Sequence, residues 1–100
     1  MKILILGGQG MAGHVMTEYF MDKKQYDVNY TSRDANDKKS IYLDVTDFKR
    51  VEETIELLKP DIIINCVGIL SDHAAQNPLL AFQVNSLLPH QLAKLIERRH

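Results

Sequence analysis

The feature that most constrains the fold is a glycine-rich turn between a short apolar segment and a helical pattern. The apolar run Lys2–Leu6 ends at glycines, which predicts a short buried strand. Glycines stand at positions 7, 10 and 13, in the spacing G-x-x-G-x-x-G, and the residues from Met11 onward are apolar at helical spacing. That apolar stripe consists of Met11, Ala12, Val15, Met16, Tyr19 and Phe20. The sequence therefore predicts a strand that turns through glycines into a helix.

Three further strands are predicted, at Asp27–Ser32 and at residues 40–43 and 61–67. The last contains three consecutive isoleucines and is apolar enough to be covered on both faces. Strands that alternate with helices pair in parallel through right-handed crossovers. The connection at residues 33–39 is short for a crossover, so any helix there would be vestigial. We expect an α/β, Rossmann-type three-layer fold with a partial parallel sheet of about four strands in the order 3-2-1-4, flanked by helices.

Two further helices complete the pattern. Thr46 or Asp47 can cap the first of them and Pro60 ends it. Its inner face would consist of Phe48, Val51, Ile55 and Leu58. The second should start near Pro78, and Pro89 should kink or interrupt it. Its apolar stripe would consist of Leu80, Val84, Leu87, Leu88, Leu92, Leu95 and Ile96.

Composition excludes several classes of function. The residues are 45% hydrophobic and 25% charged with a formal net charge of −1, and no basic stripe occurs, which argues against nucleic acid as a partner. No apolar run approaches the roughly 20 residues that span a bilayer, so no membrane contact is expected. Cys66 is the single cysteine, which predicts no internal disulfide and a reducing, cytoplasmic location. The four histidines lack metal-ligand spacing, so no metal site is expected.

The glycines occupy the positions where a dinucleotide-binding turn requires small residues. Gly7 lets the chain turn out of the strand, Gly10 lets backbone approach a pyrophosphate, and Gly13 lets the helix pack closely on the strand. The phosphates would meet free N–H groups at the positive end of the helix. The alternative is a tight turn that needs glycine for its geometry alone, while a P-loop is excluded because no lysine follows Gly13. The residues of the turn expected to bind a cofactor are Gly7, Gly10, Met11, Ala12 and Gly13.

Polar candidates follow the second and third strands. About 20 residues past the glycine turn, such folds place the group that reads the adenosine ribose. Ser32 and Arg33 stand there, a hydroxyl donor and a guanidinium suited to a 2′-phosphate, which favours NADP(H), while Asp34 keeps NAD(H) open. The alternative is a solvated loop arginine. After the third strand, Asp44 either accepts a hydrogen bond from the adenine amino group, with Val45 beside it, or only helps to cap the next helix.

The fourth strand contributes the last candidates. Cys66, Val67 and Gly68 end it at the carboxyl edge, where doubly wound sheets hold ligands, and Gly68 would let a cofactor lie close to the backbone. We interpret Cys66 as a buried small hydrophobe and not as a nucleophile, because no base or cation stands near it in sequence. Asp72 and His73 follow in a loop that either faces a substrate or is solvated.

Together these segments resemble the extended short-chain dehydrogenase/reductases that act on nucleotide sugars, and most of all the dTDP-4-dehydrorhamnose reductases. The resemblance rests on residues 7–14, 44–47, 59–65 and 78–85, in the right order and spacing. It implies the NAD(P)(H)-binding portion of a nucleotide-sugar reductase of dTDP-rhamnose biosynthesis, with a dinucleotide cofactor as ligand and a nucleotide sugar as substrate of the full-length parent.

The resemblance also implies where catalysis would take place. In the family a serine or threonine follows the fifth strand, and a Tyr-x-x-x-Lys pair lies on the next helix. The four tyrosines here, Tyr19, Tyr26, Tyr30 and Tyr42, all precede the fourth strand, and the fourth residue after Tyr42 is a threonine. We therefore expect residues 1–100 to form the N-terminal part of a dinucleotide-binding domain, without the fifth strand onward and the substrate domain, and to be inactive alone.

Three alternatives to the reductase interpretation remain open. They are an NAD(P)-binding epimerase or dehydratase of the same superfamily, a non-catalytic NAD(P)-sensing regulatory module, and a domain with no ligand. A sheet that ends at the fourth strand would leave an apolar edge, and such edges pair with other chains. We therefore also expect self-association, through the exposed fourth strand or the last helix.

Overall fold

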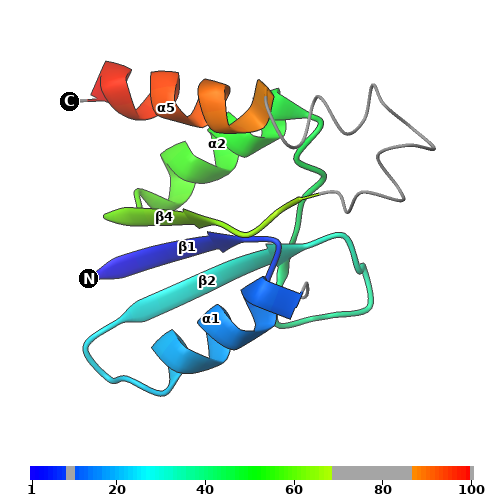
Figure 1. Cartoon of the computed structure of the whole chain (residues 1–100), viewed down its shortest axis with the longest axis vertical. Coiled ribbons are helices and arrows are strands. Elements are labelled where there is room, and N and C mark those ends of the chain that lie inside the picture. Colours follow the sequence, from blue (N-terminus) through cyan, green and yellow to red (C-terminus); the bar gives the residue numbers. More distant parts are fainter. Residues whose placement is uncertain (9–10, 69–86, 100) are drawn as a thin grey trace.

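The computed structural model describes residues 1–8, 11–68 and 87–99, and the side chains of Met11, Ala12, Arg98 and Arg99 are not described. Strands and helices alternate along the chain, except that β3 directly follows β2 (Figure 1). In chain order they are β1 (Lys2–Leu6), α1 (Met11–Met21), β2 (Asp27–Ser32), β3 (Ile41–Tyr42), α2 (Phe48–Leu58), β4 (Ile62–Asn65) and α5 (Leu88–Arg99).

The strands form one parallel sheet in the order β3-β2-β1-β4, as predicted. In its register Ile5 lies beside Tyr30 of β2 and Ile64 of β4. Helix α1 lies on one side of the sheet, and α2 and α5 lie together on the other (Figure 1). This arrangement confirms the α/β, Rossmann-type fold, and it gathers the carboxyl ends of all four strands at one edge.

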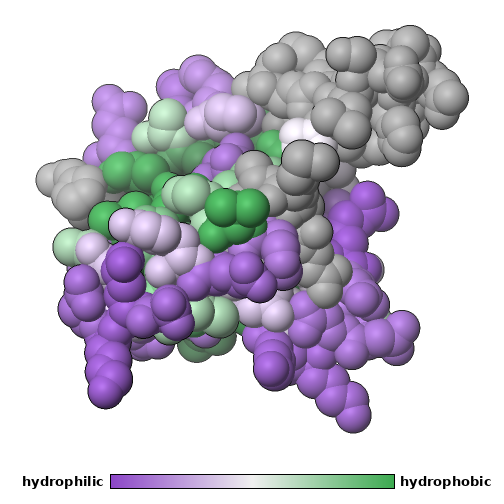
Figure 2. Space-filling model, turned by 60° about the horizontal axis from the view of Figure 1, so that its bottom comes forward, coloured by the Kyte–Doolittle hydropathy of each residue, from purple (hydrophilic) through white to green (hydrophobic). Residues whose placement is uncertain are grey.

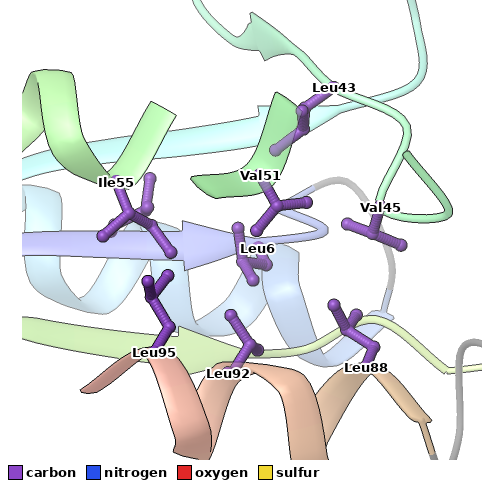
Figure 3. Close-up of a cluster of buried hydrophobic side chains, with 9 residues drawn as sticks. Leu6, Leu43, Val45, Val51, Ile55, Leu88, Leu92 and Leu95 are labelled. Atoms are coloured by element: carbon purple, nitrogen blue, oxygen red, sulfur yellow. The ribbon is translucent and has the colours of Figure 1, made fainter. Parts of the chain in front are cut away.

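The main core lies between the sheet and the α2–α5 layer. Strand β1 is buried on both faces, because successive side chains of a strand point to opposite sides. Leu4 and Leu6 face α2 and α5, where Val51 and Ile55 supply the inner face that the sequence predicts. The close-up in Figure 3 shows Leu6, Val51 and Ile55 converging with Leu43, Val45, Leu88, Leu92 and Leu95.

Helix α1 presents a different face to the sheet from the one predicted. Val15 and Tyr19, expected to be inward, are 61% and 56% exposed, and the Lys23 ammonium lies over the Tyr19 ring, 4.4 Å from its centroid. The buried positions are Gly13 and Thr17, one helical turn apart. The prediction was wrong for Val15 and Tyr19, whereas Met16 and Phe20 of the same stripe are half-buried. The stripe was read from apolar residues alone, but the close backbone contact of the helix is made by Gly13, against Gly7.

Strands β3 and β4 are shorter than predicted. β3 is confined to two residues, and Leu43 beyond it turns into the core. β4 spans Ile62–Asn65 within the predicted range 61–67, but its isoleucines are half-buried or exposed, so the expectation of cover on both faces was wrong. The physical reason is position: β4 pairs only with β1 among the described strands and is therefore an edge strand.

The remaining predictions concern the connecting segments and the ends of the helices. Residues 33–40 form two hydrogen-bonded turns, Asp34 to Asp37 and Asp37 to Ser40, with no helix. Asp47 caps α2, and its side chain accepts from the Arg50 N–H at 3.4 Å. Pro89 lies in the first turn of α5, and the residues before Leu87 that would show a kink or an interruption lie outside the described residues. The helix start expected near Pro78 lies outside the described residues. None of the described helices is long and apolar enough to cross a membrane.

Candidate functional site

A cleft of about 180 Å³ opens at the carboxyl edge of the sheet, where the ends of β1, β2, β3 and β4 meet. Of the described residues that line it, only Thr31 and Leu43 were not predicted as site residues. The described lining is Gly7, Thr31, Ser32, Arg33, Leu43, Val45, Cys66, Val67 and Gly68. The topology therefore brings together predicted candidates that come from four separate segments of the sequence.

The described part of the glycine turn is closely packed at Gly7 and at Gly13. Gly7 has a φ of +78°, and a Cβ there would lie 2.8 Å from the Cγ2 atom of Val67. A Cβ on Gly13 would run into the carbonyl oxygen of Gly7, so α1 touches the turn through backbone. Met11 and Ala12 begin α1, whose unpaired N–H groups therefore lie just past the turn. Gly10 lies outside the described residues.

Thr31 fastens the turn to the end of β2, and the sequence analysis missed it. Its hydroxyl oxygen accepts from the Gly7 N–H at 3.2 Å, and its carbonyl oxygen accepts from the Gly8 N–H at 2.8 Å. The side chain is 1% exposed. No local pattern marks Thr31 as an anchor, because only the pairing of β1 with β2 brings it to its partners Gly7 and Gly8.

Gly8 is needed for packing and not for φ. A Cβ there would lie 2.5 Å from the Tyr30 ring, so the ring occupies the space that a side chain would need. The Tyr30 hydroxyl donates to the Asp37 carboxylate at 2.9 Å. Burial, together with that carboxylate, raises the pKa of the Tyr30 phenol. Tyr30 thus ties the glycine turn to the connection between β2 and β3.

Ser32 and Arg33 both line the cleft, but their surroundings differ. Ser32 is 5% exposed, and its hydroxyl lies 2.7 Å from that of Ser40. Arg33 is exposed at the rim. The Asp34 carboxylate is occupied locally, because it accepts from the Asn36 N–H at 2.9 Å, and Asp34 does not line the cleft.

Asp44 lies beside the cleft, whereas Val45 lines it. Asp44 faces a neighbouring depression that also includes Tyr42 and Arg50. Its Oδ1 atom accepts from the Thr46 hydroxyl at 2.7 Å and from the Thr46 N–H at 3.0 Å. These two bonds hold the pKa of the Asp44 carboxyl below its usual value, and the positive charge of Arg33 acts in the same direction. The carboxylate therefore shapes the turn before α2 and stays ionised near the rim.

The segment after β4 forms the opposite wall of the cleft. The Cys66 N–H donates to the Leu6 carbonyl at 2.9 Å, and the Val67 N–H donates to the Asn65 side-chain oxygen at 3.1 Å. Cys66 is half-buried, and burial raises the pKa of its thiol, which disfavours the nucleophilic thiolate. Asp72 and His73 lie outside the described residues. Within the described ranges, no three His, Cys, Asp or Glu side chains gather in a way that could hold a metal ion.

Comparison with known proteins identifies the family to which the chain belongs. The sequence profile of the NAD dependent epimerase/dehydratase family matches residues 3–100. An uncharacterized epimerase/dehydratase of Staphylococcus saprophyticus is 44% identical over 43 residues, which are 43% of this chain and 13% of that protein.

Two solved structures show the same fold over most of the chain. L-threonine dehydrogenase of Clostridium difficile superimposes with a TM-score of 0.82 over 97% of this chain, at 28% identity. The dTDP-4-dehydrorhamnose reductase of Bacillus anthracis, solved in complex with NADP, has a TM-score of 0.71 over 87% of this chain, at 24% identity. This chain covers 33% of the first structure and 29% of the second. On the match that spans residues 3–100, the chain belongs to the NAD-dependent epimerase/dehydratase family.

Proposed function

We propose that this chain binds NAD(P)(H) in the cleft and forms the cofactor-binding portion of a nucleotide-sugar reductase similar to dTDP-4-dehydrorhamnose reductase. The observation that carries the proposal is the convergence of the glycine turn, Arg33 and Val67 on one cleft at the carboxyl edge. In open α/β sheets, this edge beside the first strand is where dinucleotides bind.

Each part of the cleft has a chemical task in this proposal. The N–H groups at the start of α1, from Met11 onward, would hold the pyrophosphate against the positive end of the helix dipole. The backbone of Gly7 leaves room for the phosphates to approach. Arg33 would meet the adenosine ribose, and the apolar side chains of Leu43 and Val45 would contact the adenine. When bound, the nicotinamide ring supplies hydride transfer, and the protein orients it.

The proposal also specifies the type of substrate and the reaction of the full-length protein. The family includes epimerases and dehydratases as well as reductases, and the reductase assignment rests on the motif resemblance at residues 7–14 and 44–47. We propose that the 100 residues bind cofactor without turning over a sugar substrate. The Tyr-x-x-x-Lys spacing that they do contain, Tyr19 and Lys23, begins on α1 before the second strand, whereas the family resemblance implies a catalytic pair on the helix after a fifth strand. We also propose a cytoplasmic location, on the single half-buried cysteine.

Saturation-transfer NMR with NADP⁺ tests the binding mode. The adenine protons should receive more saturation than the nicotinamide protons, because Arg33 and Val45, which can contact an adenosine, flank the glycine turn. Nicotinamide mononucleotide, which lacks the adenosine, serves as the control and should show no saturation. Equal saturation of both rings would contradict this orientation, and no saturation of either would contradict binding itself.

We propose further that two copies of the chain associate through β4. Its outer edge is unpaired among the described strands, and Ile62 is 41% exposed. Figure 2, which looks toward the α1 side of the sheet, shows apolar side chains at the surface among hydrophilic ones. The last helix is the weaker candidate, because Leu88, Leu92 and Leu95 are already buried against the core.

Light scattering checks this association. The apparent mass should rise with concentration into the high micromolar range, and Ile62→Lys should keep the chain monomeric, because a charge on an edge strand opposes pairing. Leu57→Lys is the matched control, since Leu57 is 82% exposed and belongs to α2 and not to β4. A wild-type chain that stays monomeric, or a Leu57→Lys effect equal to that of Ile62→Lys, would refute the β4 interface.

A further inference from the structure

The two hydroxyls of Ser32 and Ser40 form a short hydrogen bond next to the cleft. Their oxygens are 2.7 Å apart, the usual length of an O–H···O bond. Ser32 lines the cleft beside Arg33, whereas Ser40 stands at the other end of the connection between β2 and β3. Either oxygen could be the donor on distance alone.

The other bonds of this pair fix the direction of the proton. A serine hydroxyl has one hydrogen to donate. The Ser40 hydroxyl donates it to the carbonyl oxygen of Asp37, at 3.0 Å. Ser40 must then accept, so the Ser32 hydroxyl donates to it. The alternative acceptor for Ser32, the carbonyl oxygen of Asp34, is 3.5 Å away and competes poorly.

Because the Ser32 hydroxyl donates its proton to Ser40, that proton is not available for a hydrogen bond to a ligand. Its oxygen already accepts from the Asp34 N–H at 3.3 Å, and its hydrogen points to Ser40. What remains is one lone pair. A lone pair can accept from a ribose 2′-hydroxyl, but it repels the oxygens of a 2′-phosphate, which accept and do not donate.

We propose that Ser40 is a positioning residue that sets cofactor discrimination at the 2′ position by holding Ser32 as an acceptor; this rests on the proposed cofactor site. Arg33 then faces a 2′-phosphate without help from the neighbouring hydroxyl. When the Ser40 hydroxyl is removed, the Ser32 hydroxyl loses its acceptor. It can then donate a hydrogen bond to a 2′-phosphate in the cleft.

The connection should keep its shape when the Ser40 side chain is shortened. The Ser40 N–H donates to the Asp37 carbonyl at 3.2 Å, a bond that does not involve the Ser40 hydroxyl. The Asp37 carboxylate is held by the Tyr30 hydroxyl at 2.9 Å and by the Lys39 N–H at 3.1 Å. The variant Ser40→Ala therefore tests proton direction and not loop formation.

Calorimetric titration with adenosine 2′,5′-bisphosphate and with 5′-AMP isolates the contribution of the 2′-phosphate. Ser40→Ala should bind the bisphosphate roughly three- to tenfold more tightly than wild type, the worth of about one net hydrogen bond. Its affinity for 5′-AMP should be unchanged or lower. Ser40→Thr, which keeps a hydroxyl, should behave as wild type, and the double variant Ser32→Ala/Ser40→Ala should lose the gain.

The sign of the change separates this role from a structural one. A loop that merely collapsed in Ser40→Ala would displace Arg33 and weaken bisphosphate binding, the opposite of the expected result. An unchanged or lowered preference for the bisphosphate overturns the proposal while both nucleotides still bind. If neither nucleotide binds the wild-type chain, the proposed cofactor site itself fails, and the role of Ser40 fails with it.

Discussion

Gly13→Ala is expected to lower the free energy of unfolding by about 3 kcal/mol, the upper range for overpacking a tight contact. The added Cβ would overlap the carbonyl oxygen of Gly7, which is backbone and cannot move aside as a flexible side chain would. An opposite effect exists, because alanine is favoured over glycine in a helix by up to about 1 kcal/mol. The steric cost is larger, so the net change is destabilising, and it is a large fraction of the 5–15 kcal/mol typical of small domains.

The same substitution should abolish measurable cofactor binding. Relief of the overlap moves the start of α1 away from the turn, and the N–H groups that would hold a pyrophosphate move with it. Urea denaturation followed by circular dichroism gives the stability, and titration with NADP⁺ gives the affinity. His14→Ala is the matched control, because His14 is exposed in the same helix, where its Nε2 atom lies 3.2 Å from the carboxylate of Glu18. A Gly13→Ala chain as stable as His14→Ala would refute the backbone contact between α1 and the turn.

Local patterns in the sequence predicted the elements whose partners are nearby in the chain or set by general rules. The spacing of Gly7 and Gly13 marked the turn, and both residues have the close contacts expected of them. The stripe through Val51 and Ile55 predicted the buried face of α2. The sheet order followed from crossover handedness and was confirmed.

The failures share one physical cause, which is that contacts between distant segments decide them. The rotation of α1 is set by the contact of Gly13 with Gly7, so apolar Val15 and Tyr19 are left outside. The exposure of Ile62 follows from the edge position of β4 and not from its composition. The apolar composition of a segment indicates that it tends to be buried. How much of it is buried depends on how many strands lie beside it in the sheet.

In the candidate site, too, local patterns predicted some residues, whereas contacts between distant segments decided others. The residue types at positions 32, 33 and 66–68 could be singled out because the carboxyl ends of parallel strands share one edge. Thr31 was missed because its role depends on the N–H groups of Gly7 and Gly8, which pairing of β1 with β2 brings to it. The two bonds from Thr46 to Asp44 were missed because a side chain that can reach a ligand can equally bond its own turn.

Arg33→Ala is expected to weaken binding of adenosine 2′,5′-bisphosphate by about 1–3 kcal/mol, the range for a hydrogen bond to a charged group. Binding of 5′-AMP should change little, because it lacks the group that the guanidinium would meet. Arg33 lines the cleft beside Ser32, and its charge acts on Asp44 across the rim, where the proposed adenosine would bind. The preference for NADP(H) would thus depend on a single exposed side chain.

The control for this experiment is Lys49→Ala, which removes the same unit of positive charge from an exposed position on α2 outside the cleft. If long-range attraction by the whole protein were responsible, both variants would lose affinity for the bisphosphate equally, and the loss would fade as salt is added, because the Debye length is only about 8 Å at physiological ionic strength. A direct contact predicts a loss confined to Arg33→Ala that persists at that salt. Equal loss of the bisphosphate and of 5′-AMP in Arg33→Ala would show that Arg33 contacts a part of the nucleotide common to both, and the preference for NADP(H) would then have no residue to support it.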